Sequence, residues 1–194
     1  MAIQQIPVVT GPTLAQIDNS VATNSPSANN WTFIATAAPS AATDFTISGL
    51  TGYKTLLVVA YFTTVSAGLT MGMRINNATD TCTVGGVETR SGSSTTTIPR
   101  GSITNGNSYR FATGGTVQDG ANSLFMQIQN CTGSGTNQIK PITSRAVFQA
   151  PAGTPCEYTA AGHSTTTSAV SSLVFTNLAS GLTFTGNFYV FGAN

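Results

Sequence analysis

The chain closes on the sequence GLTFTGNFYVFGAN, residues 181–194, which contains no charged residue. Phe184, Phe188 and Val190 are separated mainly by residues common in strands, and Gly186 interrupts the run. Because chain ends fray unless they are docked, we expect this segment to be a strand that pairs within a sheet. Exposed edge strands are often protected by lysine or proline, but neither residue occurs after Pro155. We therefore expect that a neighbouring subunit could also cover this closing strand.

Short β-type runs separated by Gly, Asn, Ser and Pro occupy most of the chain before this strand. They span residues 31–36, 44–48, 54–64, 69–75, 108–113, 123–130, 145–150 and 171–177. Inward and outward positions alternate in two of them, with Leu69, Met71, Met73 and Ile75 in one and Leu124, Met126 and Ile128 in the other. About nine or ten strands without a long helical pattern predict an all-β, antiparallel β-sandwich of jelly-roll type over residues 31–194.

Glycine and asparagine mark the expected turns between these runs. SGLTGY at 48–53, VGGVE at 84–88, TNGNS at 104–108 and ATGGTV at 112–117 place them where a positive φ costs least. The polar stretch at 88–102 is predicted to be a solvated loop, with a contact loop as the functional alternative.

Residues 1–30 differ from the rest and predict an extended N-terminal anchoring arm. They contain three prolines and one short helix candidate at 13–19, for which Thr13 is the expected N-cap. The apolar residues Ile6, Pro7, Val8 and Val9 would have little use in a free linker, so we expect them to attach the arm to a partner.

Charged residues make up only 7% of the 194 residues, while 40% are hydrophobic. Seven Lys and Arg oppose six Asp and Glu and form no cluster, so nucleic-acid binding is not expected. The longest apolar run, at 56–62, is too short for a membrane helix, and no secretion signal is recognisable at the N-terminus. Cytosolic synthesis without membrane insertion is therefore the default expectation.

The three cysteines, Cys82, Cys131 and Cys156, have spacings that match neither a zinc motif nor a redox pair. We expect them to be reduced and buried as small apolar fillers, with one disulfide and one free thiol as the alternative.

Residues for catalysis or metal binding are sparse. His163 is the only histidine, it lies in a predicted loop, and no Gly-x-Ser-x-Gly motif accompanies it. The six carboxylates stand apart in the sequence: Asp18, Asp44, Asp80, Glu88, Asp119 and Glu157. DNS at 18–20 and INNATD at 75–80 could offer oxygen ligands to calcium, but with one carboxylate each. We therefore expect no enzyme activity, cofactor or metal.

Aromatic side chains could stack on sugar rings if they were exposed. The candidates lie within strand runs, where core packing is the favoured interpretation: Tyr53, Tyr61, Phe62, Tyr109 and Phe111.

The order WTFIA, FTISGLTGYKTLLV, GMRINN, a polar middle and LTFTGNFYVFG resembles small jelly-roll modules of tailed-bacteriophage virion proteins. Such modules occur in head decoration proteins, head fibres and tail fibres. The resemblance covers residues 31–194 and implies a structural virion protein, either a capsid decoration (cement) protein or a fibre, attached through the N-terminal arm. It would be made in the host bacterial cytoplasm and reside in the virion.

The same resemblance implies a homotrimer that contacts other capsid or tail proteins. The expected subunit interface contains Phe184, Phe188, Tyr189 and Phe191. The alternative is a receptor- or carbohydrate-binding tail-fibre module that recognises a host surface glycan through polar loops and exposed aromatic residues.

Overall fold

A computed structural model of the chain describes residues 31–65, 70–78, 81–90, 96–103, 108–113, 122–136, 138–149, 155–178 and 183–194. The chain separates into two units, Met1–Asn30 and Trp31–Asn194. The predicted arm, its helix at 13–19 and the attachment residues Ile6, Pro7, Val8 and Val9 lie outside the described residues, and only the second unit is considered below.

The described residues form twelve strands and no helix, so none of them forms a helix able to cross a membrane. In chain order the strands are β1 (Thr32–Ala37), β2 (Asp44–Ser48), β3 (Thr55–Val65), β4 (Thr70–Ile75), β5 (Cys82–Arg90), β6 (Thr96–Ile103), β7 (Tyr109–Thr113), β8 (Asn122–Ile128), β9 (Lys140–Gln149), β10 (Pro155–Ser164), β11 (Ser172–Asn177) and β12 (Thr183–Ala193).

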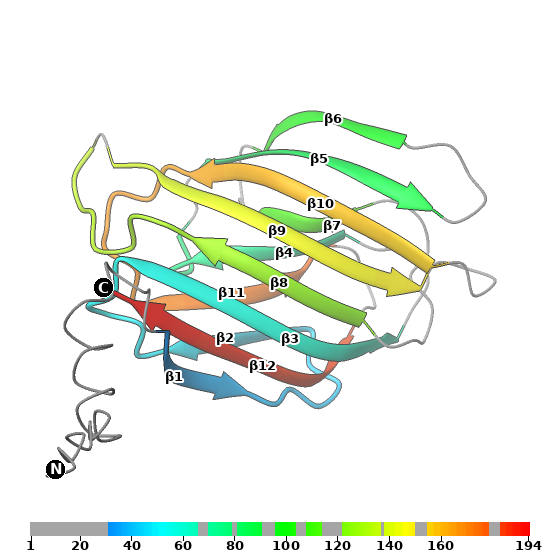
Figure 1. Ribbon diagram of the computed structural model, residues 1–194, viewed down its shortest axis with the longest axis horizontal. Coiled ribbons are helices and arrows are strands. Elements are labelled where there is room, and N and C mark those ends of the chain that lie inside the picture. Colours follow the sequence, from blue (N-terminus) through cyan, green and yellow to red (C-terminus); the bar gives the residue numbers. More distant parts are fainter. Residues whose placement is uncertain are drawn as a thin grey trace, which may run out of the picture. The chain divides into compact units, whose positions relative to one another are not determined.

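The strands form two antiparallel sheets that face each other, which confirms the predicted β-sandwich (Figure 1). One sheet has eight strands in the order β1-β12-β3-β8-β9-β10-β5-β6, and the other has four in the order β2-β11-β4-β7. Four of the pairings are nested: β1 pairs with β12, β2 with β11, β3 with β8 and β4 with β7. The chain therefore folds back on itself so that early strands meet late ones.

Aromatic rings fill the space between the two sheets. The ring of Phe188 on β12 lies 4.6 Å from that of Phe45 on β2 and 5.0 Å from that of Phe175 on β11, measured between centroids. It also stacks on Phe62 of the neighbouring strand β3 at 5.1 Å. Contacts of this kind add roughly 0.5–1.5 kcal/mol each to the effect of burial, so this cluster fastens the sheets together.

The closing strand β12 lies inside the eight-stranded sheet, between β1 and β3. Its own sheet thus supplies the pairing that the sequence led us to expect. Phe184 and Phe188 point inward and have no exposed surface, so their side chains belong to the core of their own chain and cannot reach another subunit. Tyr189 and Phe191 point to the opposite face and are half-buried.

Three turn and loop predictions were wrong because the sheet is wider than the sequence indicated. VGGVE lies within β5, and the stretch at 88–102 contributes to β5 and to β6. His163, which was expected in a loop, lies in β10. Gly86 of β5 and Gly162 of β10 serve close packing rather than turns: a Cβ at Gly86 would meet the Tyr158 ring, and one at Gly162 would meet the backbone of Thr83. By contrast, the SGLTGY turn is confirmed, with φ of 80° at Gly49 and 94° at Gly52.

All three cysteines are buried and none forms a disulfide, as predicted. The Cys131 thiol donates a hydrogen bond to the carbonyl oxygen of Ile128, at 3.3 Å. Burial raises the pKa of Cys131 to about 12, because the thiolate would lose its hydration. Cys131 is therefore a neutral core residue at physiological pH.

Gly186 tests the fit between β12 and β3. Its φ is 152°, and a Cβ there would collide with the backbone of Tyr61 and Phe62. We expect Gly186→Ala to lower the free energy of unfolding by about 2–3 kcal/mol, through backbone strain and overpacking. Gly85→Ala is the matched control, since a Cβ at Gly85 meets nothing within 4 Å, and it should be neutral or slightly stabilising. Equal urea midpoints for the two variants would refute the tight β12–β3 contact.

Candidate functional site: the outer face of the large sheet

The residues considered for catalysis are not brought together where the structure describes them. His163 and Glu157 lie on the same strand, β10, six residues apart, which is about 20 Å at the rise of an extended chain. Asp44 is on β2 of the other sheet. Asp18, Asp80 and Asp119 are outside the described residues, as is the side chain of Glu88. Among the described side chains no three of His, Cys, Asp and Glu gather into a metal-binding group.

The candidate calcium ligand Asn76 instead joins two segments of the chain. Its side-chain oxygen accepts hydrogen bonds from the backbone amides of Ser171 and Ser172, at 2.8 and 3.1 Å, and from the Ser171 hydroxyl at 3.0 Å. Its side-chain nitrogen donates to the Ala169 carbonyl at 2.8 Å. The Asn76 side chain thus holds the end of β4 against the start of β11.

The candidate interaction surface is the face of the eight-stranded sheet that points away from the four-stranded sheet. Its central residues are called the outer face below: Phe33, Leu57, Val59, Tyr61, Ser123, Phe125, Thr143, Arg145, Val147, Glu157, Thr159, Tyr189 and Phe191. Aromatic residues on it are unusually accessible, with exposed fractions of 63% for Tyr61, 54% for Phe33 and 52% for Phe125. Large exposed apolar patches commonly mark interaction sites.

Strand register brings these side chains into rows across the sheet. Tyr189 is opposite Val59, Val59 is opposite Phe125, and Phe125 is opposite Arg145. At the β1 side, Phe33 is opposite Phe191, and their rings meet edge to face with centroids 5.8 Å apart. Directly opposite side chains in a sheet are in contact, so the outer face is one continuous surface rather than scattered residues.

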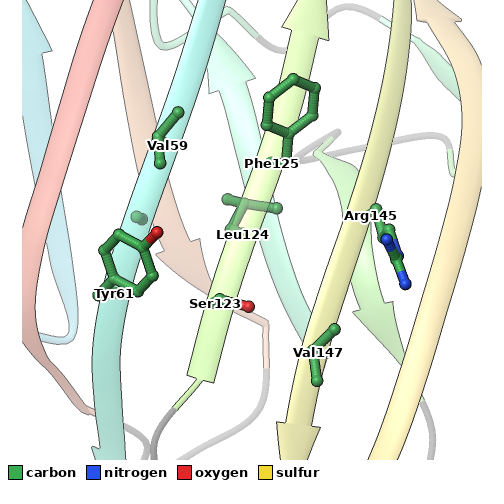
Figure 2. A pocket seen from close by; sticks show the side chains of 8 residues that line it. Val59, Tyr61, Ser123, Leu124, Phe125, Arg145 and Val147 are labelled. Atoms are coloured by element: carbon green, nitrogen blue, oxygen red, sulfur yellow. The ribbon is translucent and has the colours of Figure 1, made fainter.

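Two hollows of about 250 Å³ each flank Phe125 on the outer face. The first lies over β3, β8 and β9, and Figure 2 shows Tyr61, Phe125 and Arg145 on these three neighbouring strands around it. The second lies over β8, β9 and β10, where Thr143 and Thr159 line it beside Arg145. Phe125 and Arg145 therefore form a ridge between two shallow depressions.

Arg145 and Glu157 are the charged residues of the outer face, and they neutralise each other. The guanidinium donates two hydrogen bonds of 2.8 Å, from Nε to Oε1 and from a terminal nitrogen to Oε2 of Glu157. The pair is solvent-exposed, so its effect on stability is small. Its larger consequence is a face without net charge.

Sequence reasoning missed most of the outer face. Tyr61 was assigned to the core, whereas Phe62, Tyr109 and Phe111 are indeed buried, and Tyr53 packs partly against the core. The alternation of side chains along a strand could have predicted the exposure of Tyr61. Tyr61 and Phe62 are neighbours in one strand, so they must point to opposite faces of the sheet. Phe125 could have been assigned outward in the same way, since Leu124 and Met126 were predicted to point inward.

Comparison with protein-family models, curated proteins and solved structures finds no match to this chain. The outer face must therefore be interpreted from its own chemistry.

The Arg145–Glu157 pair should affect the pKa of the Glu157 carboxyl group. The hydrogen bonds from Arg145 hold the pKa of Glu157 below its usual value. We expect Arg145→Gln to raise the pKa of Glu157 towards that of a free glutamate, as followed by carbon NMR of the side-chain carboxyl during a pH titration. A Glu157 titration identical in both proteins would contradict the bidentate geometry.

Proposed function

We propose that this chain is a structural virion protein of a tailed bacteriophage, a capsid decoration or fibre protein that attaches through its N-terminal arm. The observation that carries the proposal is the accessible apolar surface, without net charge, that the sandwich presents on its outer face. A surface of this kind suits assembly better than catalysis, because aromatic residues and arginine are enriched where proteins meet.

The nested strand pairing supports the jelly-roll part of the proposal. Pairing β1 with β12, β2 with β11, β3 with β8 and β4 with β7 is what a doubled chain wound into two sheets would produce. In this interpretation β5, β6, β9 and β10 widen one sheet of an eight-stranded jelly roll. Viral capsid proteins and lectins both use that architecture. The fold is therefore compatible with both the structural and the glycan-binding function and does not choose between them.

The expected homotrimer and its contacts with other virion proteins remain part of the proposal. Tyr189 and Phe191 keep their place in the proposed subunit interface, because both lie on the outer face and Phe191 packs against the exposed Phe33. An assembly made through apolar contacts and neutral hydrogen bonds is less sensitive to salt than one made through ion pairs, which suits a chain with so few charges.

The alternative function is recognition of a host glycan, as in a receptor-binding tail-fibre module. Tyr61 and Phe125 are exposed rings on a flat sheet face, and the hydroxyls of Ser123, Thr143 and Thr159 lie beside them. Rings with flanking hydroxyls can stack on sugars and bond to their hydroxyl groups. Val59 and Val147 also line the first hollow, and their side chains cannot form hydrogen bonds to a sugar. We therefore rank this function second.

The attachment role can be tested in the full chain. We expect Val8→Asp with Val9→Asp to reduce co-sedimentation with phage particles depleted of this protein by at least tenfold, because a charge cannot be buried in an apolar contact without a large cost. Gln4→Asp with Gln5→Asp adds the same charge beside the contact and should attach normally.

Attachment that survives the valine substitutions would remove the arm from the proposal. Failure of the wild-type chain to bind particles, together with saturable binding to host envelope polysaccharide, would favour the glycan-binding function instead.

A further inference from the structure

Strand β3 is apolar on both of its faces over most of its length. Leu56, Val58, Ala60 and Phe62 point into the core, while Leu57, Val59 and Tyr61 point to the outer face. A strand in an antiparallel sheet with one wet face normally alternates apolar with polar residues, and an unbroken apolar run is typical of strands covered on both sides. The outward residues of β3 thus have the composition of a covered surface.

The charge distribution of the outer face is compatible with contact between two copies of this face. Arg145 and Glu157 satisfy each other within one chain, so two copies of the face can approach without repulsion between like charges. A partner with a strong charge of either sign would have to break this ion pair to reach a complementary group among the outer-face residues. Electrostatics therefore favours a neutral, apolar partner surface.

The shape of the outer face is also suited to packing against a second copy. The exposed ring of Phe125 stands between two hollows of about 250 Å³ each, so the face offers both a projection and places to receive one. A face that carries both can pack against another copy of the same chain. Aromatic anchors that enter such hollows provide most of the binding energy of many protein interfaces.

The size of the patch is adequate for association. At about 200 Å² per aromatic side chain, the exposed fractions of Phe33, Tyr61 and Phe125 leave roughly 300 Å² of accessible ring surface. That alone reaches the size of the patches that mark interaction sites on single chains. The half-buried aliphatic and aromatic neighbours on the outer face extend this apolar surface further.

We infer that the outer face, centred on Phe125 and Tyr61, is the surface through which copies of this chain pack against one another. The inference rests on the proposed structural role and adds to it the contact surface, of which Tyr189 and Phe191 form one side. The four-stranded sheet is not part of this contact.

The test is sedimentation equilibrium of the purified full chain from one to a hundred micromolar. The wild type should associate, and Phe125→Thr or Tyr61→Thr should raise the dissociation constant at least ~30-fold, as expected for loss of an interface anchor. Ile139→Thr is the matched control: Ile139 is 47% exposed but lies outside the outer face, so its loss should not change association. Circular dichroism establishes that each variant is folded.

A charge exchange gives a second, independent readout. Arg145→Glu removes the ion pair and leaves two carboxylates side by side on the face, which should weaken association and make it recover with added salt. The double variant Arg145→Glu with Glu157→Arg restores a neutral pair within each chain and should associate like the wild type.

A wild-type chain that stays monomeric at a hundred micromolar would overturn the inference. So would an oligomer that dissociates no more readily in Phe125→Thr and Tyr61→Thr than in Ile139→Thr. If these substitutions instead abolish binding of a monomer to host polysaccharide or to phage particles, the face has another occupant. Because no particles enter the sedimentation experiment, its outcome is independent of the attachment test of the proposed function.

Discussion

The contact on which the rest of the structure depends is the insertion of β12 between β1 and β3, with Phe188 packed into the core. That ring touches Phe45 and Phe175 of the four-stranded sheet and Phe62 of its own sheet. The last strand therefore completes one sheet and also fastens it to the other. Because its pairing partners lie more than a hundred residues earlier in the chain, closure requires long-range contacts, and proteins of this kind fold slowly.

The same strand links the core to the surface. Alternation along β12 directs Phe184 and Phe188 inward and Tyr189 and Phe191 outward, so a single aromatic segment contributes to both faces of the sheet. Strand β3 beside it behaves in the same way. In our account the inner residues hold one chain together and the outer residues hold copies of the chain together. A chain with only 7% charged residues can remain in solution when its apolar face is covered in this way.

Nine strands could be predicted from the sequence because each carries a run of β-branched, aromatic or alternating residues. Strands β5 and β10 could not, since Gly85, Gly86 and Gly162 interrupt their pattern and resemble turn residues. Strand β6 could not because its polar sequence was interpreted as part of a solvated loop. Gly86 and Gly162 instead allow the Tyr158 ring and the Thr83 backbone to approach closely, which only the paired structure reveals.

The candidate site was less predictable than the fold. The closing strand was expected to lie at a subunit interface, but half of its aromatic residues are in the core of their own chain. Periodicity gives the two sets of residues in a strand but does not say which set is covered when both are apolar, as for Tyr61 and Phe62. Arg145 and Glu157 are twelve residues apart in sequence, and they meet only because β9 and β10 pair in a particular register.

One matched comparison shows directly whether the inner and the outer aromatic residues have separate roles. The free energy of unfolding should be measured by urea denaturation for Phe188→Ala and Phe125→Ala, at a concentration low enough for both to be monomeric. Phe188→Ala should lose about 3–5 kcal/mol because it empties the core. Phe125→Ala should lose less than about 1 kcal/mol, since its ring is 52% exposed and lies outside the core. Similar losses for the two variants would contradict the account.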